Sequence, residues 1–146
     1  MDDTAVGISA LEAMPLFAGV TKHDLQNILK IGEIRSFEPG QRIVERGELG
    51  DSMYIVLRGV AQVDVGGRFH ELKPGEFFGE MALVAGKKRT ATVKAGDERV
   101  DAFRIGSEEF QGFLLHQPRV AIAMLKGLVD RLREVQERID SWAGAW

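Results

Sequence analysis

Residues 77–93 read FFGEMALVAGKKRTATV, a small and apolar run that holds one acid, Glu80, and a basic cluster ending in Arg89. Gly79 and Ala82 are small enough to let a ligand approach the backbone. A short helical turn in EMALVAG would present free N–H groups to an anion. Arg89 offers a fixed fork of donors that suits a phosphate and keeps its charge. The plainer alternative is that Glu80 and Arg89 form a buried ion pair.

Glu80 narrows the chemistry of such a ligand. A carboxylate beside a phosphate is repulsive unless a neutral group separates them, and a ribose 2′-hydroxyl would do this while donating a hydrogen bond. Thr90 adds a second hydroxyl beside Arg89. One acid and one arginine therefore describe a nucleotide that carries a single negative charge and a free 2′-hydroxyl.

The sequence before this run is typical of a β structure. Glycines recur between residues 40 and 80, and short runs rich in β-branched and apolar residues lie between them. Short strands separated at regular spacing by turn residues predict a sandwich or a barrel-like roll. Gly66 and Gly67 stand between two such runs and predict a two-residue hairpin. Residues 89–95 and 100–105 are the last of about eight predicted strands.

Both ends of the chain are predicted to be helical. Thr21 is expected to cap a helix within LEAMPLFAGVTKHDLQNILKIG, and Ser107 one within SEEFQGFLLHQ. Pro118 opens a longer helix that is expected to run to about Asp140. Apolar residues recur there at spacings of four and three, which is an a/d seam that could pack on the roll or on a partner chain. The seam residues are Ala121, Leu125, Leu128, Leu132, Val135 and Ile139.

Length and composition describe one domain of ordinary globular type. The 146 residues are 45% hydrophobic and 28% charged, the fractions of an ordinary soluble globular protein. The net charge of −3, with no persistently basic segment, argues against nucleic acid as a partner. No cysteine is present for a disulfide, a thiolate metal site or a thiol nucleophile. With no apolar run of spanning length, we expect a cytoplasmic protein with no membrane partner.

The chain resembles the cyclic nucleotide-binding domain of the catabolite-activator and protein-kinase regulatory-subunit superfamily. That family's phosphate-binding cassette is close to F-G-E-x-A-L, a short spacer and R-[ST/A]-A-[TS]-V, and this chain has FGEMAL, VAGKK and RTATV. Upstream, PGQRIVERGELGDSMYIVLRGVAQV and MPLFAGVTKHDL are similar to the family's strand motif and helical lead-in. The resemblance covers residues 11–135. It implies a mainly β fold with flanking helices: an eight-stranded antiparallel β-roll (jelly-roll-like, a double-stranded β-helix) with N-terminal helices and a long C-terminal helix.

The resemblance also predicts how the chain is organised. We expect a single cyclic nucleotide-binding domain over residues 1–146. Its expected parts are a helical lead-in (11–35), the β-roll (36–106) with its cassette (77–93), and the C-terminal helices (107–141).

A site for cAMP, or for cGMP, without a metal follows from the same resemblance. Arg89 would bind the exocyclic phosphate oxygens, and Glu80 would bind the 2′-hydroxyl. A Thr at position 90 is associated in the family with cGMP, yet bacterial members with Ser there respond to cAMP, so both nucleotides stay open, with cAMP favoured. The other implied contacts are Gly79, Met81, Ala82, Leu83 and Ala91 in the cassette, Val63 and Phe69 in strands, and Leu125, Lys126 and Arg131 as a lid.

The implied function is that of a sensing module. A bound cyclic nucleotide would reposition the C-terminal helix, which would signal to a dimer mate or a partner protein. The alternative is a dimerisation or protein-interaction scaffold with a vestigial nucleotide pocket. Catalysis is not expected, because the sequence contains no recognisable nucleophile–base pair or metal cluster. The winged-helix DNA reader that many relatives carry after the last helix is not expected either.

Overall fold

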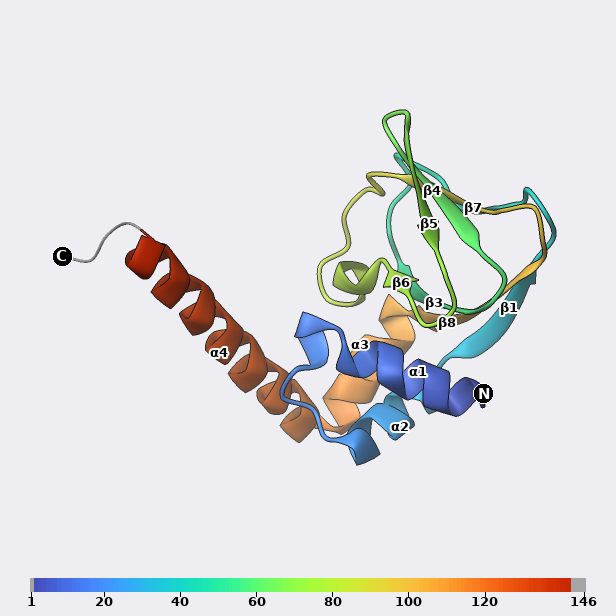
Figure 1. The fold of residues 1–146 in the computed structure, drawn as a ribbon. Helices are drawn as coiled ribbons and strands as arrows, with labels where there is room; N and C mark the ends of the chain where they lie inside the picture. The colour runs from blue at the N-terminus through green and yellow to red at the C-terminus, as the bar shows by residue number, and fades with distance from the viewer. Residues whose placement is uncertain (1, 143–146) are drawn as a thin grey trace.

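The computed structural model describes residues 2–142 and consists of two antiparallel sheets closed on each other, with helices packed against one of them (Figure 1). One sheet has the strand order β1-β8-β3-β6 and the other β2-β7-β4-β5, so the predicted eight-stranded roll with flanking helices is confirmed. The strands are β1 (Glu33–Phe37), β2 (Arg42–Val44), β3 (Ser52–Arg58), β4 (Ala61–Val65), β5 (Arg68–Leu72), β6 (Phe77–Phe78), β7 (Thr92–Ala95) and β8 (Val100–Gly106). The helical elements are α1 (Asp3–Glu12), η1 (Pro15–Phe17), α2 (Lys22–Lys30), η2 (Glu80–Leu83), α3 (Ser107–His116) and α4 (Pro118–Trp142).

Strand β3 belongs to both hydrophobic cores, which explains its nearly continuous apolar sequence. Successive side chains of a strand point to opposite faces. Met53 and Ile55 therefore face the helices, where they join one buried cluster. Tyr54 and Val56 face the second sheet and join the other cluster inside the roll. A strand covered on both faces needs apolar residues at every position, and this is why SMYIVL lacks polar alternation after Ser52.

The hairpin between β4 and β5 forms where the two glycines predict it. Val65 pairs with Arg68 across the turn, and Gly66 and Gly67 have φ angles of 58° and 89°. Two consecutive positive φ angles are the requirement of a tight hairpin turn, and glycine meets it without strain. The first strand of this hairpin, β4, contains Val63.

The helical lead-in starts earlier than the sequence predicts. Helix α1 begins at Asp3, whereas the expected lead-in begins at residue 11. Its residues are mostly small and show no clear apolar stripe, so periodicity does not reveal it. The helix forms because Asp2 caps it and because Gly7 lets Leu29 of α2 pack closely; a Cβ at Gly7 would lie 2.9 Å from Leu29 Cδ2.

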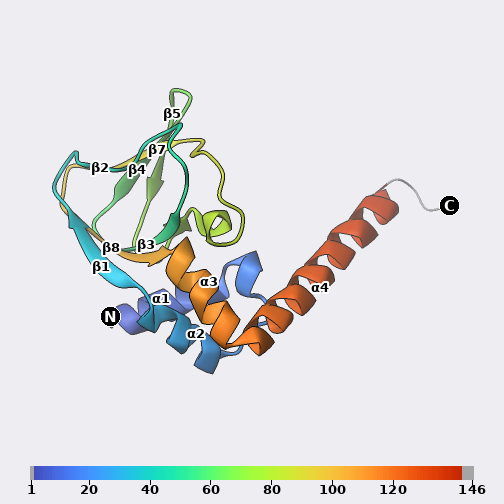
Figure 2. The same cartoon turned by 180° about the vertical axis from the view of Figure 1, so that it is seen from behind.

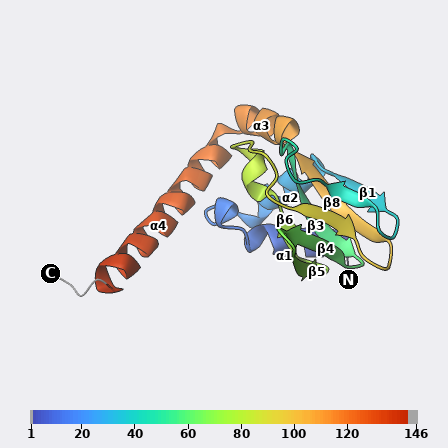
Figure 3. The same cartoon turned by 90° about the horizontal axis from the view of Figure 1, so that it is seen from above.

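Helix α4 packs on the N-terminal helices at its start and then extends away from the roll (Figures 2 and 3). Its start is anchored by Arg119, which donates two hydrogen bonds of 2.8 and 2.9 Å to the carboxylate of Asp24 in α2. These bonds lower the pKa of the buried Asp24 carboxyl. Most of the predicted seam is uncovered, since Leu125, Leu132, Val135 and Ile139 are 43–68% exposed. No helix in the described range combines the length and apolarity that crossing a membrane requires.

A polar cluster around Asp101 ties α1 to the roll. Asp101 accepts hydrogen bonds from Ser36 (2.6 Å) and Arg58 (2.8 Å), and Arg58 also donates to Asp3 of α1 (2.7 Å). The bond from Ser36 and then that from Arg58 lower the pKa of Asp101 from 3.8 to about 2. Because the folded-state pKa is depressed, this stabilisation is complete above the unfolded value and is lost as the pH falls from about 4 through about 2.

This cluster predicts a specific pH dependence of stability. Asp101→Asn removes the titrating group, so between about pH 4 and about pH 2 the wild type should lose about 1–2 kcal/mol more unfolding free energy than the variant. Urea unfolding across this pH range measures the difference. Asp97→Asn, at an exposed turn position, is the matched control. If the unfolding free energies of the wild type and Asp101→Asn fall in parallel with pH, the cluster does not stabilise the fold.

Candidate ligand-binding site

The backbone around Arg89 is fixed by a neighbouring loop. The Arg89 N–H donates to the carbonyl of Glu48 (2.7 Å), and the Gly47 N–H donates to the carbonyl of Arg89 (2.9 Å). The side chain is fixed as well, because Nη2 donates to the Ser52 carbonyl (2.8 Å) and lies 3.3 Å from the Ser52 hydroxyl oxygen, which accepts from it. Ser52 is 1% exposed at the start of β3. Arg89 is therefore held in place before any ligand binds.

Gly79 makes room for this arrangement. It has a left-handed backbone with φ of 80°, and it precedes the short 3₁₀ turn η2 that begins at Glu80. A Cβ at this position would lie 2.6 Å from Arg89 Nη1 and 2.9 Å from the Ser52 carbonyl oxygen. Glycine is thus required here both by the backbone conformation and by the space that Arg89 occupies.

Arg89 lies at the edge of a cavity of about 630 Å³ between the sheet β2-β7-β4-β5 and the cassette. This volume falls in the range of small-molecule sites. The lining combines apolar side chains with a basic group of residues. The apolar lining includes Val44, Val63, Val65, Phe78, Ala82 and Val93, and the polar lining includes Lys87, Lys88, Arg89 and Thr90.

The charge of Arg89 has no carboxylate partner within residues 2–142. The alternative interpretation of a direct ion pair with Glu80 fails, since no such pair is among the salt bridges of this part of the chain. Burial lowers the pKa of the Arg89 guanidinium, and the nearby Asp51 and Glu48 carboxylates only partly oppose this effect. An anion entering the cavity would compensate this cost of burial, and a singly charged phosphate has the right sign and geometry.

Most of the cassette residues predicted to contact a ligand line this cavity. Among the other predicted residues, Glu80 is half-buried at the start of η2, Leu83 is fully buried against the helices, and Phe69 is 68% exposed on β5. None of these three is part of the cavity lining, so their roles remain predictions. The predicted residues that line it are Val63, Gly79, Met81, Ala82, Arg89, Thr90 and Ala91.

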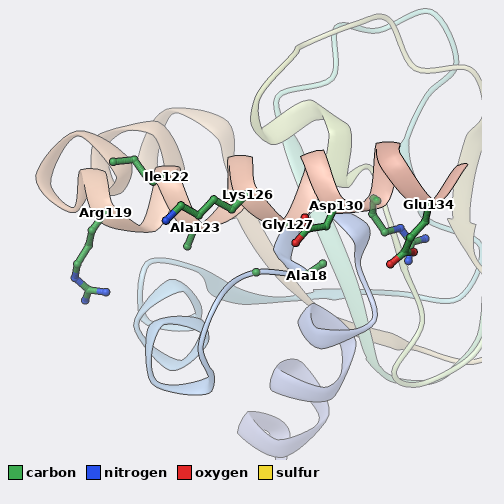
Figure 4. A pocket seen from close by; sticks show the side chains of 10 residues that line it. Ala18, Arg119, Ile122, Ala123, Lys126, Gly127, Asp130 and Glu134 are labelled. Carbon is green, nitrogen blue, oxygen red and sulfur yellow. The ribbon is translucent and has the colours of Figure 1, made fainter. Parts of the chain in front are cut away.

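The three predicted lid residues lie on α4 and do not line this cavity. Leu125 is 61% exposed, while Lys126 and Arg131 line a separate groove of about 590 Å³ between α4 and the η1–α2 segment (Figure 4). At the floor of that groove Gly127 touches Gly19, and a Cβ at Gly127 would lie 2.5 Å from the Gly19 nitrogen. A lid role for α4 therefore requires it to leave this position.

Two contributors to the site were missed by sequence reasoning. Ser52, which receives the Arg89 side chain, reads in the sequence as a polar residue at the edge of an apolar strand. Gly50, in the loop that pairs with the cassette, donates its N–H to the Lys87 carbonyl (2.8 Å). Both belong to the run GELGDSMY. Small residues directly before and at the start of an apolar strand are the sequence signal that could have indicated Gly50 and Ser52.

Comparison with known proteins decides the family. The sequence model of one protein family, the cyclic nucleotide-binding domain, matches residues 34–117, which is more than half of the chain. The chain belongs to this family. As a cyclic nucleotide-binding domain it is similar to a cyclic nucleotide-gated potassium channel of Rhizobium etli, with 34% identity over 82% of this chain. It is also similar to a cGMP-dependent protein kinase of Toxoplasma gondii, with 36% identity over 67% of this chain.

Solved structures agree with this assignment. The N-terminal domain of a transcriptional regulator from Streptomyces coelicolor superposes with a TM-score of 0.73 at 28% identity, covering 88% of this chain and 95% of that one. The catabolite activator protein of Thermus thermophilus gives a TM-score of 0.60 at 29% identity, covering 89% and 63%. The chain spans only 33% of the length of the Rhizobium channel and 10% of the Toxoplasma kinase. The similarity therefore concerns this domain and not the channel or kinase activity of those proteins.

Proposed function

We propose that this domain is a sensor of a cyclic mononucleotide, cAMP or cGMP. In this proposal the exocyclic oxygens of the cyclic phosphate bind Arg89, the ribose 2′-hydroxyl donates to Glu80, and the base lies against the apolar lining near Val63. The observation that carries the proposal is the unpaired guanidinium of Arg89. It is held by Ser52 at the edge of a mostly apolar cavity, and no carboxylate of the described chain forms a salt bridge with it.

The output of the sensor would pass through α4. Its apolar seam is exposed, and its first turns rest on the N-terminal helices through the Arg119–Asp24 pair and the Gly127–Gly19 contact. A bound base offers a new apolar surface, so a nucleotide that contacts α4 would favour a position of this helix closer to the roll. The exposed seam would then change its contacts with a dimer mate or another protein.

A thermal-shift panel tests ligand binding. The chain is heated with cAMP, cGMP, a cyclic dinucleotide or linear AMP, each at about millimolar concentration, and a ligand that binds the folded state raises Tm. We expect a rise with a cyclic mononucleotide and a smaller or absent rise with linear AMP, whose second phosphate charge meets Glu80. If no cyclic mononucleotide shifts Tm, the scaffold alternative replaces the sensor, and sedimentation would then show a dimer that is indifferent to nucleotide.

Thr90 predicts a base-dependent effect. It is exposed on the cavity side, where its hydroxyl can reach the base of a bound nucleotide. Thr90→Ala is expected to weaken cGMP binding by about three- to tenfold, as for one lost hydrogen bond, and to leave cAMP binding nearly unchanged. Thr90→Ser keeps the hydroxyl and should retain the cGMP affinity. Equal losses for both nucleotides in a calorimetric titration would show that Thr90 does not read the base.

A further inference from the structure

A second arginine, Arg104, lies mostly inside the roll. It lies on β8 directly opposite Tyr54 of β3 and on the same face as Ala102, so its side chain points into the interior between the two sheets. The Arg104 side chain is 16% exposed. Its Nε is buried and has no hydrogen-bond partner, which is true of no other buried side-chain nitrogen or oxygen in residues 2–142. Such a donor costs free energy in the folded state, so its presence calls for a physical reason.

Arg104 and Arg89 share one hydrogen-bonded pair of residues. Arg89 Nη2 donates to both oxygens of Ser52, and the Ser52 hydroxyl donates to Asp51 Oδ1 (3.0 Å). The Arg104 Nη2 lies 3.7 Å from the same Asp51 oxygen. The side chain of Asp51 is 69% exposed, so solvent screens its negative charge. Two arginines thus meet at one polar pair that neutralises them incompletely.

Like charges at one site favour the binding of an opposite charge. Burial is the main cause that lowers the pKa of Arg89, and the positive charge of Arg104 adds a smaller effect in the same direction. In the ligand-free domain the two cations repel each other, whereas an anion on Arg89 is attracted by both. The effect of Arg104 therefore has opposite signs on the stability of the free domain and on the affinity for an anion.

We propose that Arg104 is a positioning residue of the ligand site, a second cation that strengthens phosphate binding through Arg89 and the Ser52–Asp51 pair. This inference rests on the proposed function and adds a residue that sets the affinity of the site for the nucleotide. Arg104 does not line the cavity, so it acts without touching the nucleotide.

Two variants of Arg104 test the role of its charge. Arg104→Met keeps an unbranched stem and removes the charge, and Arg104→Lys keeps the charge. Calorimetry with cAMP and cGMP is expected to show a Kd about tenfold weaker for Arg104→Met and close to the wild-type value for Arg104→Lys. The Tm of ligand-free Arg104→Met should be equal to or above that of the wild type. Arg35→Met removes a positive charge from the exposed side of β1 and should change neither quantity.

The outcomes separate this inference from the function on which it rests. A wild-type Kd for Arg104→Met overturns the inference and leaves the sensor intact. A lower Tm with weakened binding in both Arg104 variants also overturns it, since Arg104 would then act through packing. If the wild-type chain binds neither nucleotide, the proposed function itself fails, and the inference fails with it.

Discussion

Replacing Arg89 with alanine is expected to weaken cyclic nucleotide binding by about 100-fold, because two charge-assisted hydrogen bonds to the phosphate would be lost in a half-buried site. The loss should be accompanied by little change in fold, since Arg89→Ala removes a poorly solvated charge and leaves only the buried oxygens of Ser52 without a donor. Competition against a fluorescent cAMP analogue measures the affinity over this range.

The control for this variant is a surface arginine. Arg35→Ala removes the same charge from β1, where the side chain is 48% exposed and paired with Glu33. It should bind nucleotide as the wild type does. A loss of less than about threefold in Arg89→Ala would contradict the assignment of Arg89 to the phosphate.

A methyl group on Gly127 is expected to displace α4. The nearest atoms are the backbone of Gly19 and Ala18, which cannot move aside as a flexible side chain would; the Gly19 nitrogen lies 2.5 Å from the Cβ position. We therefore expect Gly127→Ala to lower Tm by roughly 3–10 °C and to speed amide hydrogen exchange in the first half of α4. If α4 must leave this position to cover a nucleotide, the same variant should bind cAMP no more weakly than the wild type does.

A second helical glycine supplies the matched control. Gly112 lies within α3 and has no atom within 4 Å of its Cβ position. Gly112→Ala should raise stability by up to about 1 kcal/mol through helix propensity alone. Similar melting temperatures for the two variants would show that the Gly127–Gly19 contact does not hold α4.

The sequence predicted the parts of the protein whose signals are local. The cassette lies in one continuous run, so the residue types that suit a phosphate and a ribose can be recognised together between Gly79 and Thr90. The strands could be predicted because glycines punctuate them, and Gly66-Gly67 forms the expected hairpin. Helix α1 was not predicted because its small residues show no helical periodicity of apolar positions, although Asp2 caps it.

The parts that escaped prediction depend on contacts between distant residues. Ser52 and Arg89 are 37 positions apart, and only the pairing of the cassette with the loop before β3 brings them together. Arg104 reads as one polar residue within an apolar strand, and its register opposite Tyr54 is what places it inside the roll. The seam of α4 has the same period whether it packs on the roll or on a partner, and in the structure Leu132 and its neighbours are left exposed.

Isothermal titration of the chain with cAMP and cGMP shows whether the cavity beside Arg89 binds a cyclic mononucleotide. We expect saturable binding of at least one of them to one site per chain, with Arg89→Ala weakening that binding about 100-fold. The absence of both heat and thermal stabilisation at about millimolar cAMP and cGMP would contradict it.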